Sequence, residues 1–122
     1  MLKTIRKHHI SFKNAFNGIR LAFTSQPNFR VHLSFSFLAI VLGVILRISY
    51  MEMVLLIFTI VFGLTVEMVN TSIEAMTDLI TKEWKVEAKI AKDIAAGMML
   101  LTAIGAVFVA ILIFIPYLIQ II

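Results

Sequence analysis

Long runs of apolar residues, separated by short polar breaks, make up most of this chain. Three apolar segments stand out, at residues 31–46, 53–66 and 94–122. A helix needs about 20 mostly apolar residues to cross the hydrocarbon layer of a bilayer. The third segment has this length, and the first two reach it when their flanking turns are included. The pattern predicts three membrane helices at about 29–47, 51–80 and 93–119, within one domain over residues 1–122.

The first residues of the chain follow a different pattern, in which apolar side chains recur at helical spacings. These positions are Leu2, Ile5, Phe12, Phe16, Ile19 and Phe23, with basic residues mostly between them. A helix with one apolar and one basic face lies along a membrane surface. We therefore predict an amphipathic surface helix over residues 2–24, which either anchors the chain to anionic lipid or also covers a site.

Two polar breaks predict where membrane helices begin. Pro27 follows Ser25 and Gln26, and proline suits the first position of a helix. Ser49 and Glu52 have the spacing of a capping box, in which each side chain bonds to the other residue's backbone. This predicts a structural role for Glu52. Residues 81–92 form a longer polar connection, which the sequence predicts to precede the third membrane helix.

The composition supports a small membrane protein. The chain has 122 residues, of which 61% are hydrophobic and 15% are charged, outside the usual range of water-soluble domains. The absence of cysteine from the sequence excludes disulfides and thiolate metal sites.

The distribution of basic residues predicts how the chain is oriented in the membrane. Of the eleven lysines and arginines, only Arg47 lies between the first two membrane segments, and none follows Lys92. Basic residues collect on the cytoplasmic side of membrane proteins. We expect a multi-pass protein of the cell membrane, with its N-terminus and the 81–92 connection in the cytoplasm and its C-terminus outside.

A row of polar side chains continues from the second apolar segment. Glu67, Asn70, Glu74 and Asp78 share one face of a helix, because successive residues turn by about 100°. Ionisable groups at membrane depth are costly and mark functional sites. The row suits metal-assisted or general-base chemistry on a membrane molecule. From these residues alone, a lipid kinase, a small oligomeric proton-coupled transporter and a structural subunit all remain open.

The chain has no glycine-rich phosphate-binding loop of the P-loop type. Any nucleotide chemistry must therefore use side chains, and phosphoryl transfer mainly requires positioning and charge neutralisation. Glu74, nearer water, suits a hydrated Mg²⁺ ion, and the deeper Glu67 suits a general base for a lipid hydroxyl. Asn70 could orient that hydroxyl, while Lys92 and Asp93 supply a cation for phosphate and a further carboxylate.

Two motifs resemble one known family. The pattern Glu67-x-x-Asn70-Thr-x-Ile-Glu74-x-x-x-Asp78, then Glu83, then Ala88-Lys89-x-Ala91-Lys92-Asp93-x-Ala95-Ala96-Gly97, resembles the bacterial membrane diacylglycerol kinases. Phe12-x-x-Ala15-x-x-Gly18-Ile19-Arg20 followed by Asn28-Phe29-Arg30-Val31-His32-Leu33 resembles them too. The Asn-x-Arg-x-His-Leu element is similar to the Gram-positive branch, which includes undecaprenol kinases. The resemblance covers nearly the whole chain.

The resemblance implies a lipid kinase that uses ATP and Mg²⁺ to phosphorylate the primary hydroxyl of diacylglycerol or undecaprenol. Glu67 would be the general base with Asn70 beside it, and Glu74 a metal ligand. The residues implied around the nucleotide are Asp78, Glu83, Lys85, Lys92 and Asp93. The family's fold is all-α, with an interfacial N-terminal helix and three membrane helices, assembled as a homotrimer with shared active sites. No nucleic-acid partner is expected.

Two departures from the family pattern bear on activity. Gln26 stands where the family has a second metal-binding glutamate, and Trp84-Lys85 replaces a Tyr-His pair beside the nucleotide. Gln26 could ligate Mg²⁺ more weakly, or the chain could be a catalytically weakened paralogue. The spacing of His8, His9 and His32 fits no metal site, so we interpret all three as surface or interfacial residues. The transporter hypothesis does not explain the cluster of basic and acidic residues between Glu74 and Asp93.

Overall fold

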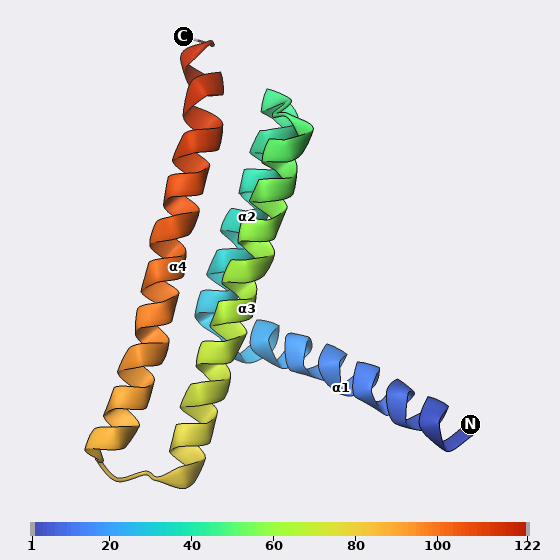
Figure 1. Ribbon diagram of the computed structural model, residues 1–122, viewed down its shortest axis with the longest axis vertical. Helices are drawn as coiled ribbons and strands as arrows, with labels where there is room; N and C mark the ends of the chain where they lie inside the picture. The colour runs from blue at the N-terminus through green and yellow to red at the C-terminus, as the bar shows by residue number, and fades with distance from the viewer. Residues whose placement is uncertain (1, 122) are drawn as a thin grey trace.

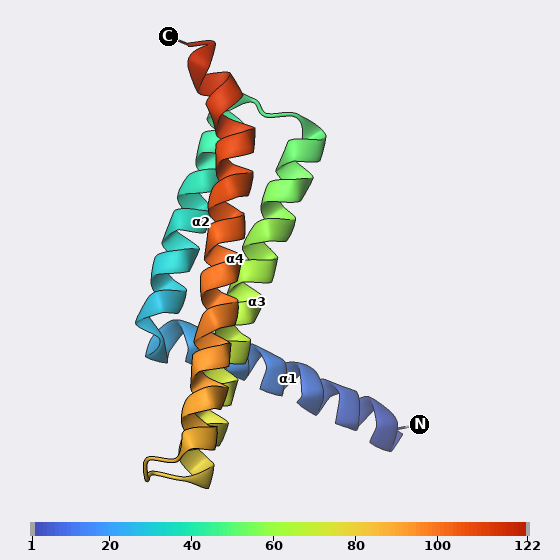
Figure 2. The same ribbon diagram turned by 60° about the vertical axis from the view of Figure 1, so that its left-hand side comes forward.

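Residues 2–121, whose backbone the computed structural model describes, form four α-helices: α1 (Leu2–Ser25), α2 (Pro27–Leu46), α3 (Tyr50–Ile80) and α4 (Val86–Ile119). Side chains are described for residues 11–121. Helices α2, α3 and α4 form a bundle, and α1 projects sideways from it (Figures 1 and 2). Three of the described helices, α2 to α4, are long and apolar enough to cross a membrane. The predicted all-α fold with three membrane-length helices is therefore confirmed.

The turn between α2 and α3 is closely packed. Arg47 ends α2 in the left-handed conformation with φ at 53°, and the backbone N–H of Ile48 donates to the Gly43 carbonyl over 3.1 Å. A Cβ atom on Gly43 would lie 2.9 Å from Cδ1 of Ile48, so this close approach favours glycine. The predicted capping box then starts α3: Ser49 Oγ accepts from the Glu52 N–H, and the Glu52 side chain accepts from the Ser49 N–H. This confirms the structural role of Glu52.

Helix α4 begins earlier than its apolar pattern predicts. We expected it to start at residue 93, but its first residue is Val86, and the turn spans only 81–85. The segment 86–92 has no proline or glycine. Glu87 complements the positive end of the helix dipole, and Lys89 pairs with Asp93 one turn later. The apolar pattern predicts only the part of a helix that can contact lipid. Polar residues with good helix propensity can extend the helix beyond that apolar part, as residues 86–92 do here.

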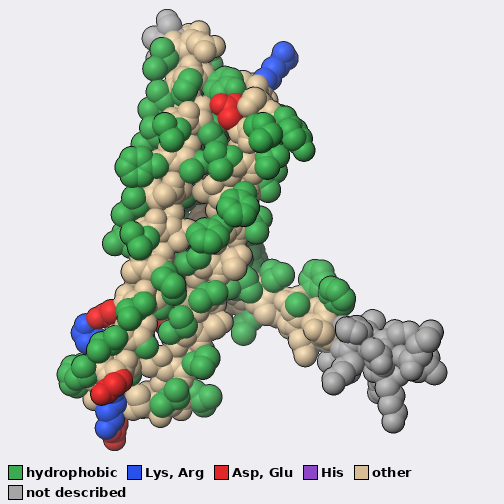
Figure 3. All heavy atoms as spheres, in the orientation of Figure 1, with side chains coloured by type: hydrophobic (Ala, Val, Ile, Leu, Met, Phe, Trp, Pro, Cys, Tyr) green, Lys and Arg blue, Asp and Glu red, His purple; other side chains and the backbone are tan. Residues whose placement is uncertain are grey.

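The bundle buries few side chains and exposes many apolar ones. Helix α3 packs mainly on α4, and α2 packs mainly on α3. The buried core lies near the α2–α3 turn and contains Ile48, Leu56, Ile113 and Phe114. On the face shown in Figure 3, hydrophobic side chains predominate between the ends of the bundle, and charged side chains lie toward those ends. Such an exposed apolar belt suits contact with lipid or with further copies of the chain.

Helix α1 leaves the bundle at the level where α2 begins (Figures 1 and 2). Arg30 of α2 holds the end of α1, because its Nη1 donates to the carbonyls of Thr24 at 3.1 Å and Phe23 at 3.4 Å. Phe12 and Phe16 are both at least 70% exposed. The side chains of Leu2, Ile5, His8 and His9, used in the sequence-based predictions, lie outside the described residues.

A tyrosine connects the far end of α4 to the start of α3. Tyr117 Oη donates to Oε2 of Glu52 over 2.6 Å, and the same carboxylate oxygen accepts from the Ser49 N–H over 2.8 Å. Tyr117→Phe removes the bond between the helices but keeps the ring, so we expect a lower midpoint of thermal unfolding. Tyr50→Phe is the matched control because Tyr50 is 81% exposed. Equal midpoints for the two variants would show that the bond adds no stability.

Candidate active site

The polar row on α3 runs from a buried to an exposed end. Glu67 is only 2% exposed, Asn70 is half-buried, and both Glu74 and Asp78 are exposed. Asn70 Nδ2 donates a 3.1 Å hydrogen bond to Oε1 of Glu74, so these two side chains lie together on one face of the helix. The bond keeps the Glu74 carboxylate close to Asn70 and leaves its other oxygen available to a ligand.

Two acceptor atoms in this row are buried without a hydrogen-bond partner in the described part of the chain. They are Oε2 of Glu67 and Oδ1 of Asn70. Burying an unpaired polar atom is costly, so proteins leave few of them, and those that remain call for an explanation. Donor groups from a bound ligand or from a neighbouring side chain would supply the hydrogen bonds that these two atoms lack. The imidazole Nδ1 of His32, on α2, lies 3.9 Å from Glu67 Oε2.

Charged residues at the α3–α4 turn form pairs. Lys92 of α4 donates to Oδ1 of Asp78 on α3 over 2.6 Å, which joins the two helices at the exposed end of the polar row. Asp93 pairs with Lys89 on α4. Within the turn, Lys85 Nζ lies 3.3 Å from a carboxylate oxygen of Glu83. The charged residues that the sequence singled out are thus gathered at one end of the bundle, on α4, the turn and the end of α3.

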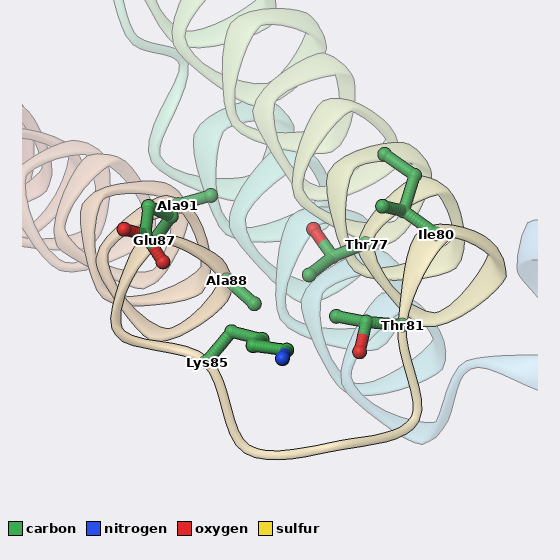
Figure 4. Close-up of a pocket in the computed structure, with 7 residues that line it drawn as sticks. All are labelled: Thr77, Ile80, Thr81, Lys85, Glu87, Ala88 and Ala91. Carbon is green, nitrogen blue, oxygen red and sulfur yellow. The ribbon is translucent and has the colours of Figure 1, made fainter.

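A pocket of about 460 Å³ lies beside these pairs, between the end of α3 and the start of α4 (Figure 4). Its lining residues are Thr77, Ile80, Thr81, Lys85, Glu87, Ala88 and Ala91. Figure 4 shows the Lys85 side chain extending across the opening toward α3. Thr77 precedes Asp78 and Ala91 precedes Lys92, so the pocket adjoins that ion pair. This volume lies in the range of small-molecule sites.

The geometry combines a buried carboxylate, a polar row and a pocket whose lining includes Lys85 and Glu87. Comparison with known proteins identifies the family. Residues 13–114 match the prokaryotic diacylglycerol kinase family. The chain belongs to that family. This confirms the predicted enzyme class, a membrane lipid kinase, and implies ATP as co-substrate. The predicted resemblance is therefore correct.

Three relatives show how far the similarity extends. A diacylglycerol kinase of Synechocystis is 37% identical over 101 residues, which are 82% of this chain and 58% of the relative. An undecaprenol kinase of Bacillus subtilis is 34% identical over 107 residues, 87% of this chain and 86% of the relative. A diacylglycerol kinase of Escherichia coli is 31% identical over 93 residues, 76% of each. The chain thus spans less than two thirds of the Synechocystis relative but most of the other two.

The departures from the family pattern lie in the connections between helices. Gln26 is half-buried at the junction of α1 and α2, where it precedes the first residue of α2 without a side-chain capping bond. The described residues contain no group of three or more acidic or histidine side chains that could hold a metal alone. Trp84 is 75% exposed in the α3–α4 turn. The assignment of a metal to Glu74 and Gln26 therefore stays a prediction.

The structure revises the interpretation of His32. Sequence spacing indicated only a surface or interfacial residue, yet its side chain, 36% exposed, lies against the buried carboxylate of Glu67. Periodicity could not show this, because the two residues lie on different helices. The available signal was only that His32 lies near the start of α2, at the same end of the bundle as the polar row.

Proposed function

We propose that this protein transfers the γ-phosphoryl group of ATP to the primary hydroxyl of a membrane lipid alcohol, with Glu67 as the general base. The observation that carries the proposal is the Glu67 carboxylate, which is 2% exposed and lies at the inner end of a polar row that leads to the charged end of the bundle. A general base must lie within hydrogen-bond reach of the proton that it removes. Family membership supports this function over a transporter or a structural subunit.

The reaction assigns one task to each end of the polar row. The lipid hydroxyl oxygen bonds to the γ-phosphorus as its proton moves to Glu67, and the bond to the bridging oxygen of ADP breaks. Asn70 lies one turn along α3 from the base. Its Nδ2 has a second N–H besides the one donated to Glu74, and this N–H orients the same hydroxyl by donating to its oxygen. The buried location excludes water, which would otherwise compete as the phosphoryl acceptor.

The exposed end of the row serves the nucleotide. Glu74 is an exposed carboxylate held by Asn70, a donor type that suits Mg²⁺ shared with phosphate oxygens. When bound, Mg²⁺ neutralises phosphate charge. Lys92, positioned by Asp78, meets a phosphate, and the nucleoside occupies the pocket that Lys85 lines. Glu83 and Asp93 then lie around the nucleotide, as the family resemblance implies.

The membrane arrangement follows the charge pattern. We place the N-terminus and the α3–α4 turn in the cytoplasm, where ATP is available, and the C-terminus outside. Helix α1 then lies in the membrane interface with exposed residues such as Phe12 and Phe16 in lipid. A homotrimer with shared sites is consistent with the exposure of Glu74 and with the apolar outer surface of the bundle.

The acceptor lipid is best tested directly. Relatives of both names are similarly related to this chain. The resemblance of the Asn28–Leu33 element to the Gram-positive branch favours undecaprenol over diacylglycerol. The experiment supplies purified protein in nanodiscs with γ-labelled ATP, Mg²⁺ and either lipid alone. We expect label in both lipids, with the higher kcat/KM for undecaprenol. Label in neither lipid from a folded protein would contradict the proposed function.

Gln26→Glu tests whether the junction of α1 and α2 contributes to the metal site. An added carboxylate binds Mg²⁺ more tightly than an amide, so we expect up to about a tenfold decrease in the Mg²⁺ concentration that gives half the maximal rate. Asn28→Asp adds the same charge two residues away and should leave this concentration near the wild-type value. If Gln26→Glu also leaves it unchanged, Gln26 does not contact the metal. If the wild-type protein is inactive and Gln26→Glu restores activity, the chain is a catalytically weakened paralogue.

A further inference from the structure

Glu67 presents a buried oxygen whose only described ionic neighbour is a histidine. Oε2 has no hydrogen-bond partner in the described part of the chain, and Nδ1 of His32 lies 3.9 Å away. This separation is too long for a direct hydrogen bond and too short to hold a water molecule between the two atoms. A small rotation of the His32 side chain would bring Nδ1 within bonding distance. Catalytic hydrogen bonds are often long in free enzymes and shorten when substrate binds.

The surroundings of His32 favour this contact. The hydroxyl of Ser36 donates to the backbone carbonyl of His32 over 2.7 Å, so it does not occupy the imidazole. Because the side chain of His32 is about one third exposed, its ring can turn, whereas that of Glu67 is 3% exposed and confined. Helix α2 packs on α3, which keeps the two residues facing each other across the helix pair.

A carboxylate base works best when one of its oxygens is held by another group. A base that is itself oriented by a third residue is the general arrangement in nucleophile activation. From the His32–Glu67 geometry we propose that His32 is a positioning residue: its Nδ1–H donates to Oε2 of Glu67 and directs Oε1 toward the lipid hydroxyl. This inference rests on the proposed function, because it assigns Glu67 the role of the base. His32 itself touches neither the hydroxyl nor the phosphates.

Nitrogen NMR tests the contact without any activity assay. The chain has three histidines, so protein labelled with ¹⁵N-histidine in nanodiscs gives a simple spectrum, which His32→Asn assigns. We expect His32 to carry its proton on Nδ1 and its Nδ1 resonance to shift in Glu67→Gln. The matched control is Glu74→Gln, on the same helix but at the exposed end of the row, which should leave the resonance in place. An unchanged His32 resonance in Glu67→Gln would overturn the inference.

Kinetics test what the contact does. We expect His32→Leu to lower kcat about 10- to 100-fold, the range for a hydrogen bond to a charged group, with KM for ATP unchanged. His32→Asn places an amide N–H near the position of Nδ1 and should restore most of the lost rate. Ser36→Ala, one turn further along α2, should retain wild-type kcat. Equal rates for His32→Leu and His32→Asn would overturn the positioning role.

The two experiments separate failure of this inference from failure of the proposed function. If the wild-type enzyme is active but its His32 resonance does not change in Glu67→Gln, the proposed role of His32 is wrong and the proposed lipid kinase function stands. If the protein phosphorylates neither lipid but the His32 resonance does shift in Glu67→Gln, the contact exists and the proposed function is wrong. The contact would then have no catalytic role.

Discussion

Glu67→Gln is expected to reduce the rate of lipid phosphorylation by about 10²- to 10⁴-fold, the usual contribution of a general base. The substitution preserves the size of the side chain and one oxygen acceptor but removes the basicity that accepts the hydroxyl proton. Glu67 is almost fully buried on α3, so water can hardly replace it as the proton acceptor. The measurement is the initial rate of label transfer from γ-labelled ATP to lipid in nanodiscs.

A second glutamate on the same helix controls this prediction. Glu52 lies at the opposite end of α3, where it accepts bonds from Ser49 and Tyr117. We expect Glu52→Gln to lower the thermal unfolding midpoint and to leave kcat of the folded protein near the wild-type value. Label transfer that persists in Glu67→Gln would remove Glu67 from the role of base. A similar loss of kcat in both variants would point to structural damage instead.

Glu74→Gln should weaken the use of Mg·ATP. We expect the KM for ATP and the Mg²⁺ concentration that gives half the maximal rate to rise by about 10- to 100-fold, because a metal ligand loses its charge. Glutamine keeps a side-chain oxygen, so the hydrogen bond from Asn70 Nδ2 to this side chain can persist. The substitution therefore isolates the charge from the geometry. The measurement is a series of initial rates over Mg²⁺ and ATP concentrations.

The companion control is a nearby acidic residue outside the polar row. Glu87 lies in the first turn of α4 and lines the pocket, so Glu87→Gln should affect nucleotide affinity without changing the Mg²⁺ requirement. If Glu74→Gln leaves the Mg²⁺ dependence of the rate at its wild-type value, Glu74 is not a metal ligand. In that case the polar row acts on the lipid hydroxyl and has no role in metal binding.

Local sequence patterns predicted much of the fold. Apolar length predicted three helices that can cross a membrane, and the spacing of Ser49 and Glu52 predicted the cap of α3, which the structure contains. The start of α4 was wrong by several residues, because hydropathy measures contact with lipid and ignores helix-forming polar residues such as those at 86–92. Local signals thus predict the existence of a helix better than its ends.

Contacts between helices account for most of what the sequence did not show. Periodicity placed Asn70 and Glu74 on one face, and the hydrogen bond between them agrees with this. The bond from Tyr117 to Glu52 joins residues 65 positions apart, and His32 meets Glu67 across α2 and α3. Such pairs depend on how the helices pack and on their rotation about their own axes. The chemical roles in the polar row remain predictions, drawn from residue type and family resemblance.

Equilibrium binding of Mg·ATP to Glu67→Gln and Glu74→Gln, measured side by side in nanodiscs, tests the division of tasks along α3 most directly. We predict that Glu67→Gln retains the wild-type Kd and that Glu74→Gln raises it about tenfold or more, because only Glu74 is assigned to the metal. Loss of affinity in Glu67→Gln alone, or an equal loss in both variants, would contradict the assignment of Glu67 to the lipid hydroxyl and Glu74 to Mg·ATP.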